Sequence, residues 1–264
     1  MKKLILLLLS ILLALSIMAY ASEIGAPKAS LQTSTGRIAG NYKISKSYPL
    51  TKTVHGIDGV IQLLQDCRLT KDDYNKQYGR TSGDEIGTHK SALGAVLRIM
   101  SKRKEVFRIV ESHTYEVSVA WLEEVRLSDS DTPTYLFTLD KSTGMGSYTG
   151  PITYFYKVAD GKLKPVECIN NDTKKKEKMI LMRSLKTAWK LTKSKDGKSK
   201  EILNVSCRPD GVAKSKDDDI FLIYYDRFHF NGKEWVKFEK VEKGYWESEG
   251  KDDMPLLSKF PASL

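Results

Sequence analysis

A glycine-rich stretch between two strand-like runs is the part of the sequence that most resembles a ligand-binding loop. It reads Gly144-Met145-Gly146-Ser147-Tyr148-Thr149-Gly150. Its third glycine is one position late for the dinucleotide pattern G-x-G-x-x-G, and Pro151 and a strand-like run follow where that pattern needs a helix. Ser147 also lies outside the G-x-S-x-G context of a hydrolase nucleophile. Because glycines let a ligand approach the backbone closely, we predict a hairpin loop with ligand contacts at Gly144, Gly146, Ser147 and Tyr148.

Aromatic residues interleaved with lysines form a second pattern. They are Tyr154, Tyr156, Trp189, Tyr224, Tyr225, Phe228, Trp235, Tyr245 and Trp246. Exposed rings stack on sugars or bases and nearby lysines hold phosphates, but strands also use aromatic residues to build their core. We interpret most of them as core residues. Tyr245 and Trp246 follow Gly244 near the polar C-terminal end, so we predict that these two contact a ligand.

Residues that hold metals or transfer protons form no local motif. The four histidines are spread from His55 to His229 without the spacing of a zinc site. The acidic clusters at 129–131 and 217–219 lack the glycine and the distal glutamate of a calcium loop. We therefore predict no metal and no cofactor. A hydrolase whose carboxylates or histidines come from separate strands leaves no local motif, and it stays open as an alternative.

The N-terminal residues resemble a secretory signal peptide. Lys2 and Lys3 precede an apolar run from Leu4 to Met18, and Ala19-Tyr20-Ala21 supplies small residues for cleavage after Ala21. The apolar run is shorter than the roughly 20 residues of a membrane-spanning helix, although an uncleaved anchor is the alternative. We predict export to the periplasm or the medium, with no transmembrane segment after cleavage.

Three cysteines, Cys67, Cys168 and Cys207, would then lie in an oxidising compartment that permits one disulfide. Cys168 and Cys207 each end an apolar, strand-like run, so neighbouring strands would bring them together. We predict a disulfide between these two. Cys67 lies in an expected amphipathic helix and is interpreted as a small buried hydrophobic residue.

The elements expected to position these groups divide the chain after residue 21 into three parts. Residues 22–53 are rich in Ser, Thr, Gly and Lys and are expected to form a flexible arm. Residues 54–104 are expected to be helical, with apolar residues at helical spacing over 57–64 and 93–100 and a short helix over 70–79. Residues 105–264 are expected to be an antiparallel, β-rich region.

Period-two alternation and turn signals support the β-rich part. Strand-like runs lie at 106–110, 117–127, 135–139, 152–158, 220–230 and 235–241. The dipeptides Asp160-Gly161, Asp196-Gly197 and Asn231-Gly232 are preferred centres of tight hairpins. Their separations of 36 and 35 residues indicate either a repeated unit or an ordinary meander of hairpins. The fold class predicted is α+β, dominated by an antiparallel meander.

The net positive charge of the chain favours anionic partners without identifying a particular one. The net charge of +10 attracts anionic material such as lipid headgroups, wall polymers or nucleic acid, although acidic residues are interspersed with the lysines. We expect an exported, non-catalytic binding or accessory protein of the cell envelope, whose partner is an anionic envelope component or another protein. No specific binding of nucleic acid is predicted.

Overall fold

A computed structural model of the chain describes residues 42–66, 93–112, 119–128, 132–140, 150–184, 186–194, 197, 199–209, 220–246, 260–261 and 264. All described residues belong to one compact unit, Thr33–Leu264. The predicted signal peptide therefore lies outside the described residues. Within the described part, no helix has the length and apolar character that a membrane crossing requires.

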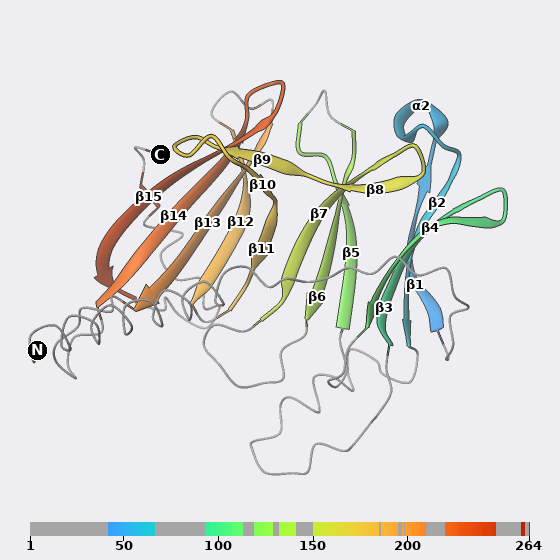
Figure 1. Ribbon diagram of the computed structural model, residues 1–264, viewed down its shortest axis with the longest axis horizontal. Coiled ribbons are helices and arrows are strands. Elements are labelled where there is room, and N and C mark those ends of the chain that lie inside the picture. Colours follow the sequence, from blue (N-terminus) through green and yellow to red (C-terminus); the bar gives the residue numbers. More distant parts are fainter. Residues whose placement is uncertain are drawn as a thin grey trace, which may run out of the picture. The chain divides into compact units, whose positions relative to one another are not determined.

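The described strands form three sheets, all antiparallel apart from one parallel pair between β15 and β9 (Figure 1). The N-terminal sheet has the order β1 (Tyr42–Leu50), β2 (Gly59–Asp66), β3 (Leu93–Ser101), β4 (Lys104–Ser112), with the short helix α2 (Lys52–His55) between β1 and β2. The middle sheet has the order β11 (Ile180–Met182), β7 (Ile152–Ala159), β6 (Thr134–Asp140), β5 (Val119–Val125), and β8 (Lys162–Pro165) also pairs with β7. The C-terminal sheet has the order β10 (Lys176–Lys178), β9 (Glu167–Asn170), β15 (Trp235–Tyr245), β14 (Ile220–Phe230), β13 (Lys200–Pro209), β12 (Thr187–Lys193).

The β-rich region is confirmed. The prediction of helices over 57–64 and 93–100 is wrong. Residues 59–66 and 93–101 form β2 and β3. Consecutive residues of both strands are buried, such as Leu63 with Leu64 and Val96 with Leu97. A strand covered on both faces is a continuous apolar run, and a helical period fits such a run equally well. β1 also occupies the end of the expected flexible arm, whereas residues 22–41 and 70–79 lie outside the described residues.

The three hairpins are confirmed, but only Asp160-Gly161 forms a two-residue connection, between Ala159 and its partner Lys162; the other two connections are longer. Gly161, Gly197 and Gly232 have φ values of +71°, +71° and +94°, and they connect β7 to β8, β12 to β13 and β14 to β15. Positive φ is the conformation for which glycine is favoured at these centres. The first turn belongs to the middle sheet and the other two to the C-terminal sheet. Their even spacing thus arises from a meander and not from copies of one unit.

The middle sheet buries residues on both of its faces, which places it between two partners. On one face, Leu136 and Phe155 join a hydrophobic cluster with Ile202, Phe228 and other residues of the C-terminal sheet. Adjacent residues of a strand point to opposite faces, so Tyr135 faces the other way. There its ring centroid lies 6.0 Å from that of Tyr48 in β1.

Side chains of the N-terminal sheet close the outer edge of β5, the last strand of the middle sheet. The Tyr48 hydroxyl donates a hydrogen bond to the Leu122 carbonyl over 3.2 Å, and the Gln65 amide donates to the Ala120 carbonyl. These bonds satisfy backbone groups that an edge strand otherwise leaves unpaired. They also hold β1 and β2 beside β5.

The predicted disulfide is wrong. Cys168 lies in β9 and Cys207 in β13, and both thiols are free and buried. Strands β15 and β14 separate the two, which at the usual strand spacing corresponds to roughly 14 Å. A disulfide joins Cα atoms that are at most about 7 Å apart. Cys67 lies outside the described residues.

Candidate functional site

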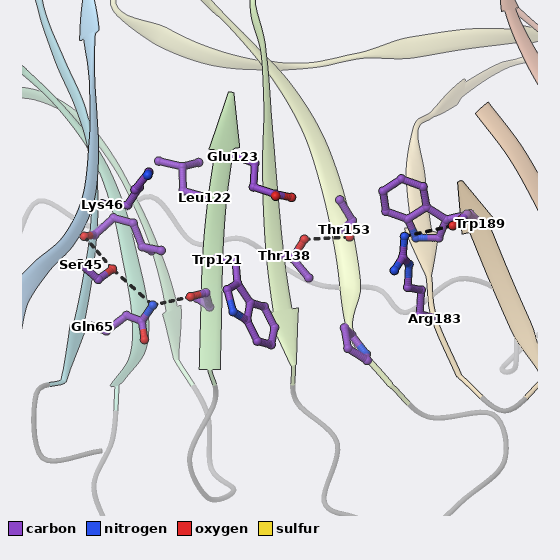
Figure 2. A pocket seen from close by; sticks show the side chains of 13 residues that line it. Ser45, Lys46, Gln65, Trp121, Leu122, Glu123, Thr138, Thr153, Arg183 and Trp189 are labelled. Carbon is purple, nitrogen blue, oxygen red and sulfur yellow. Dashed lines mark hydrogen bonds between the residues drawn. The ribbon is translucent and has the colours of Figure 1, made fainter. Parts of the chain in front are cut away.

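A pocket of about 650 Å³ runs across the middle sheet and is called the trough below (Figure 2). Strands β1 and β2 form one wall, β5 to β7 form the floor, and Arg183 with Trp189 of β12 forms the opposite wall. The lining residues are Ser45, Lys46, Leu63, Gln65, Ala120, Trp121, Leu122, Glu123, Thr138, Pro151, Thr153, Arg183 and Trp189. The trough thus combines indole rings, hydroxyl groups and charged groups from five strands and a connecting segment.

A row of cross-strand neighbours forms the floor. Trp121 pairs with Thr138, Thr138 pairs with Thr153, and Thr153 pairs with Leu181 of β11. Paired residues share a face, and three strand intervals span about 14 Å. The Thr138 and Thr153 hydroxyl oxygens lie 2.8 Å apart, as Figure 2 shows. Because one hydroxyl proton suffices for this bond, the pair retains a second proton and lone pairs for a ligand.

Arg183 directly follows β11 and is held in place by several contacts. Its Nη2 donates to the Trp189 carbonyl over 3.1 Å, and its Cζ lies 4.7 Å from the Trp189 ring centroid. Its own N–H donates to the Pro151 carbonyl over 2.9 Å. The Arg183 carbonyl lies so close to Gly150 that a Cβ there would come within 1.8 Å of the oxygen. The guanidinium is thus positioned by both its backbone and its ring contact.

The charge of Arg183 has no close counter-ion in the described part of the chain. Burial lowers the pKa of Arg183, and the charge of Glu123, which lies beyond ion-pair distance, opposes that change. A guanidinium has five N–H donors, and the Trp189 carbonyl takes one of them. The remaining donors are available to an anion, because the Arg183 side chain remains accessible to solvent.

The rest of the trough adds a stacking surface and two further charges. Trp121 is half-buried, and Figure 2 shows its ring beside β5. Lys46 is exposed, with its Nζ 5.2 Å from the centroid of the Tyr48 ring. Glu123 is exposed and lies two residues from Trp121, hence on the same face of β5. The charged groups of the lining give a formal sum of +1.

None of the predicted ligand-contact residues is among the described residues that line the trough. Gly144, Gly146, Ser147 and Tyr148 are outside the described residues, although Gly150 and Pro151 at the end of that loop support Arg183. Tyr245 is 61 % exposed on β15. Trp246 packs against a cluster of the C-terminal sheet that includes Tyr225 and Phe260. The role of these residues in ligand binding stays a prediction.

Trp121 and Arg183 were not singled out from the sequence. Trp121 stands within an expected strand, where an aromatic residue is ordinary. Arg183 belongs to no motif, and its importance arises only from the neighbours that folding brings to it. Among the described residues, no three His, Cys, Asp or Glu side chains are grouped so that they would hold a metal ion.

The chain has no match among protein-family models, curated proteins or solved structures. Its function is therefore argued from the trough itself.

Proposed function

We propose that this chain is an exported, non-catalytic binding protein of the cell envelope, and that its ligand lies in the trough. The observation that carries the proposal is the combination of a ring, a hydroxyl pair and a fixed guanidinium in one pocket over the middle sheet. Sites for small molecules and polymers are concave, with a few convergent polar groups that fix the orientation of the ligand. The signal-like N-terminus supports the location in the envelope.

The chemistry of the lining favours binding over catalysis. The rings and Thr138 supply contact surface and hydrogen bonds, while Lys46 and Arg183 supply positive charge. Glycoside hydrolysis uses two carboxyl groups, and Glu123 is the one carboxylate among the described lining residues. A hydrolase with a dispersed site remains the alternative, and it is distinguished by turnover of the bound material.

The test uses chain that an expression host has exported and processed. Wall polymer, lipopolysaccharide and anionic vesicles are each offered in a pull-down at low salt and at about 0.5 M salt, where surface attraction is screened. We expect one of these fractions to retain the protein in high salt. Trp121→Ala should abolish that retention, whereas Tyr224→Ala, which removes a half-buried ring outside the trough, should leave it unchanged.

Two results would contradict the proposal. Retention that disappears in high salt would mean loose attraction by surface lysines. Retention that is equal in Trp121→Ala and wild type, with both variants folded by thermal melting, would place the ligand elsewhere. Release of soluble fragments from the bound fraction would favour the hydrolase instead, and recovery of unprocessed chain from the cytoplasm would refute export.

A further inference from the structure

Arg183 differs from three other arginines whose contacts the structure describes. Arg98, Arg108 and Arg227 each lie within ion-pair distance of a carboxylate. Arg183 instead stacks on Trp189 and makes a single hydrogen bond to a carbonyl. A planar guanidinium with unused donors matches the two oxygens of a carboxylate, which it binds through two parallel hydrogen bonds. Since stacking on Trp189 already restricts its rotamers, little conformational entropy is lost when an anion binds.

The floor of the trough indicates what the rest of the ligand is. Trp121 and Leu181 stand at the two ends of the row that passes through Thr138 and Thr153, and Arg183 follows two residues after Leu181. A ring at one end suits the apolar face of a sugar, and hydroxyls in the middle suit its hydroxyl groups. Gln65 donates to Ser45 and to the Ala120 carbonyl, which leaves its side-chain oxygen as an acceptor at the wall.

Charge and surface character favour an acidic sugar over a lipid headgroup. The formal sum of +1 in the lining matches one carboxylate, whereas a doubly charged phosphate would leave an excess of negative charge in the trough. The large apolar side chains that are exposed in the described part of the chain lie outside the trough: Ile44, Val54, Val106, Val241 and Tyr245. In the lining, Leu63, Ala120 and Leu122 are almost fully buried, so the aliphatic surface left in the trough for an acyl chain is small.

We infer that the ligand in the trough is an extended saccharide bearing carboxylate groups, with one carboxylate on Arg183 and a sugar ring on Trp121. The length of the floor, about 14 Å over three strand intervals, accommodates more than one sugar unit. This inference rests on the proposed function and names the ligand class of the same site. Arg183 is the residue that sets the preference for an acidic ligand.

Calorimetric titration of the processed chain with an oligouronate tests the inference. Arg183→Lys keeps the positive charge but cannot form two parallel hydrogen bonds to a carboxylate. We expect it to weaken binding of the oligouronate by about tenfold or more. The matched control is Arg208→Lys, because Arg208 also stacks on a ring, that of Tyr224 with 5.1 Å to the centroid, and does not line the trough. The control should bind as wild type does. The carboxyl-reduced form of the same oligosaccharide should bind wild type as weakly as the oligouronate binds Arg183→Gln.

A charge variant gives a second readout that a merely structural role would not change. Glu123→Gln removes the like charge beside the carboxylate, and we expect it to tighten binding of the oligouronate by a few-fold at low salt. It should leave binding of the carboxyl-reduced oligosaccharide unchanged. Equal affinity of wild type and Arg183→Lys, or equal affinity for the two forms of the oligosaccharide, would overturn the inference.

The failure of this inference differs from the failure of the proposed function. If the oligouronate does not bind while an envelope fraction is still retained through Trp121, the binding function stands and the ligand class is wrong. If anionic vesicles or inorganic phosphate displace that fraction from the protein, the anionic group that Arg183 binds is a phosphate. If neither the oligouronate nor any fraction binds through Trp121, both proposals are wrong.

Discussion

The buried ion pair between Lys237 and Asp226 allows a quantitative test of the C-terminal sheet. Lys237 Nζ lies 3.2 Å from Asp226 Oδ1, and the Asn204 amide donates to the other carboxylate oxygen over 2.9 Å. Asp226 is only 7 % exposed. Two further carboxylates approach the same ammonium group, Glu239 at 3.0 Å and Glu177 at 3.9 Å. Lys237 is thus the positive centre of a mostly acidic cluster.

The direction of the pKa shift of Asp226 determines how the free energy of unfolding changes with pH. Burial raises the pKa of Asp226, while the nearby charge of Lys237 and the amide of Asn204 oppose that rise. A carboxyl group whose pKa is raised by folding favours the folded state below its unfolded pKa, and this contribution is lost as the pH rises through the folded value. Removal of the ammonium raises the pKa of Asp226 further. The resulting destabilisation is therefore largest near neutral pH and decreases under acid conditions.

The perturbation is Lys237→Met, which keeps the apolar stem and removes the charge. Breaking a buried pair by removing one partner costs about 3–5 kcal/mol, because the other charge stays buried without compensation. The double variant Lys237→Met with Asp226→Asn leaves no stranded charge and should recover most of that loss. Lys240→Met is the matched control, since Lys240 lies on the same strand and pairs with Glu242 at 2.7 Å on the exposed surface. An exposed pair contributes at most about 1 kcal/mol.

Urea denaturation of the four proteins at pH 7 and at pH 5 measures these differences in the free energy of unfolding. We expect the deficit of Lys237→Met to be smaller at pH 5 than at pH 7. Equal losses in Lys237→Met and Lys240→Met would refute the buried pair. A double variant as unstable as Lys237→Met alone would show that the stranded charge is not the cause.

Three further predictions address other parts of the chain. Burial lowers the pKa of His55, which accepts a hydrogen bond from the Thr51 N–H and lies 3.1 Å from the Tyr135 hydroxyl, so the free energy of unfolding should decrease as the pH falls below about 6.5. His55→Gln should lose that pH dependence in denaturation curves, and an unchanged slope would contradict the assignment. Gly59→Ala should destabilise the fold more than Gly197→Ala does in thermal melts, because a Cβ at Gly59 meets the Met100 carbonyl at 2.1 Å and one at Gly197 meets nothing within 4 Å. Burial raises the pKa of Cys168 to about 12 and that of Cys207 to about 11, so peptide mapping after alkylation should find both thiols protected in the native state and free after unfolding; detection of a peptide linking the two would contradict the structure.

Local patterns in the sequence predict the hairpins and most strands, including β4, but not β1, β2 and β3 of the N-terminal sheet. The turn at Gly161 is set by two adjacent residues, and the alternation in 152–158 by one strand. In β3, Ala95, Val96 and Leu97 are all buried, so no alternation marks the strand. A strand of this kind cannot be told from a buried helix by periodicity alone.

The trough and the cysteines show why the candidate site was missed. Trp121, Thr138 and Arg183 come from separate elements, and each is an ordinary residue in its own segment. Only the pairing of the folded strands places Trp121 beside Thr138 and brings Arg183 to the same pocket. The same lack of register information led to the pairing predicted for Cys168 and Cys207, because a sequence does not show which strands become neighbours.

The two side chains that close the outer edge of β5 also protect the protein from aggregation. An open edge strand pairs with extended segments of other chains and is a starting point for aggregation. Tyr48 and Gln65 occupy the carbonyls of this edge only while β1 and β2 are in place. Local unfolding of β1 and β2, which requires less free energy than global unfolding, exposes β5 while the C-terminal sheet stays folded. Damage to the N-terminal sheet should thus lead first to aggregation of a largely folded protein.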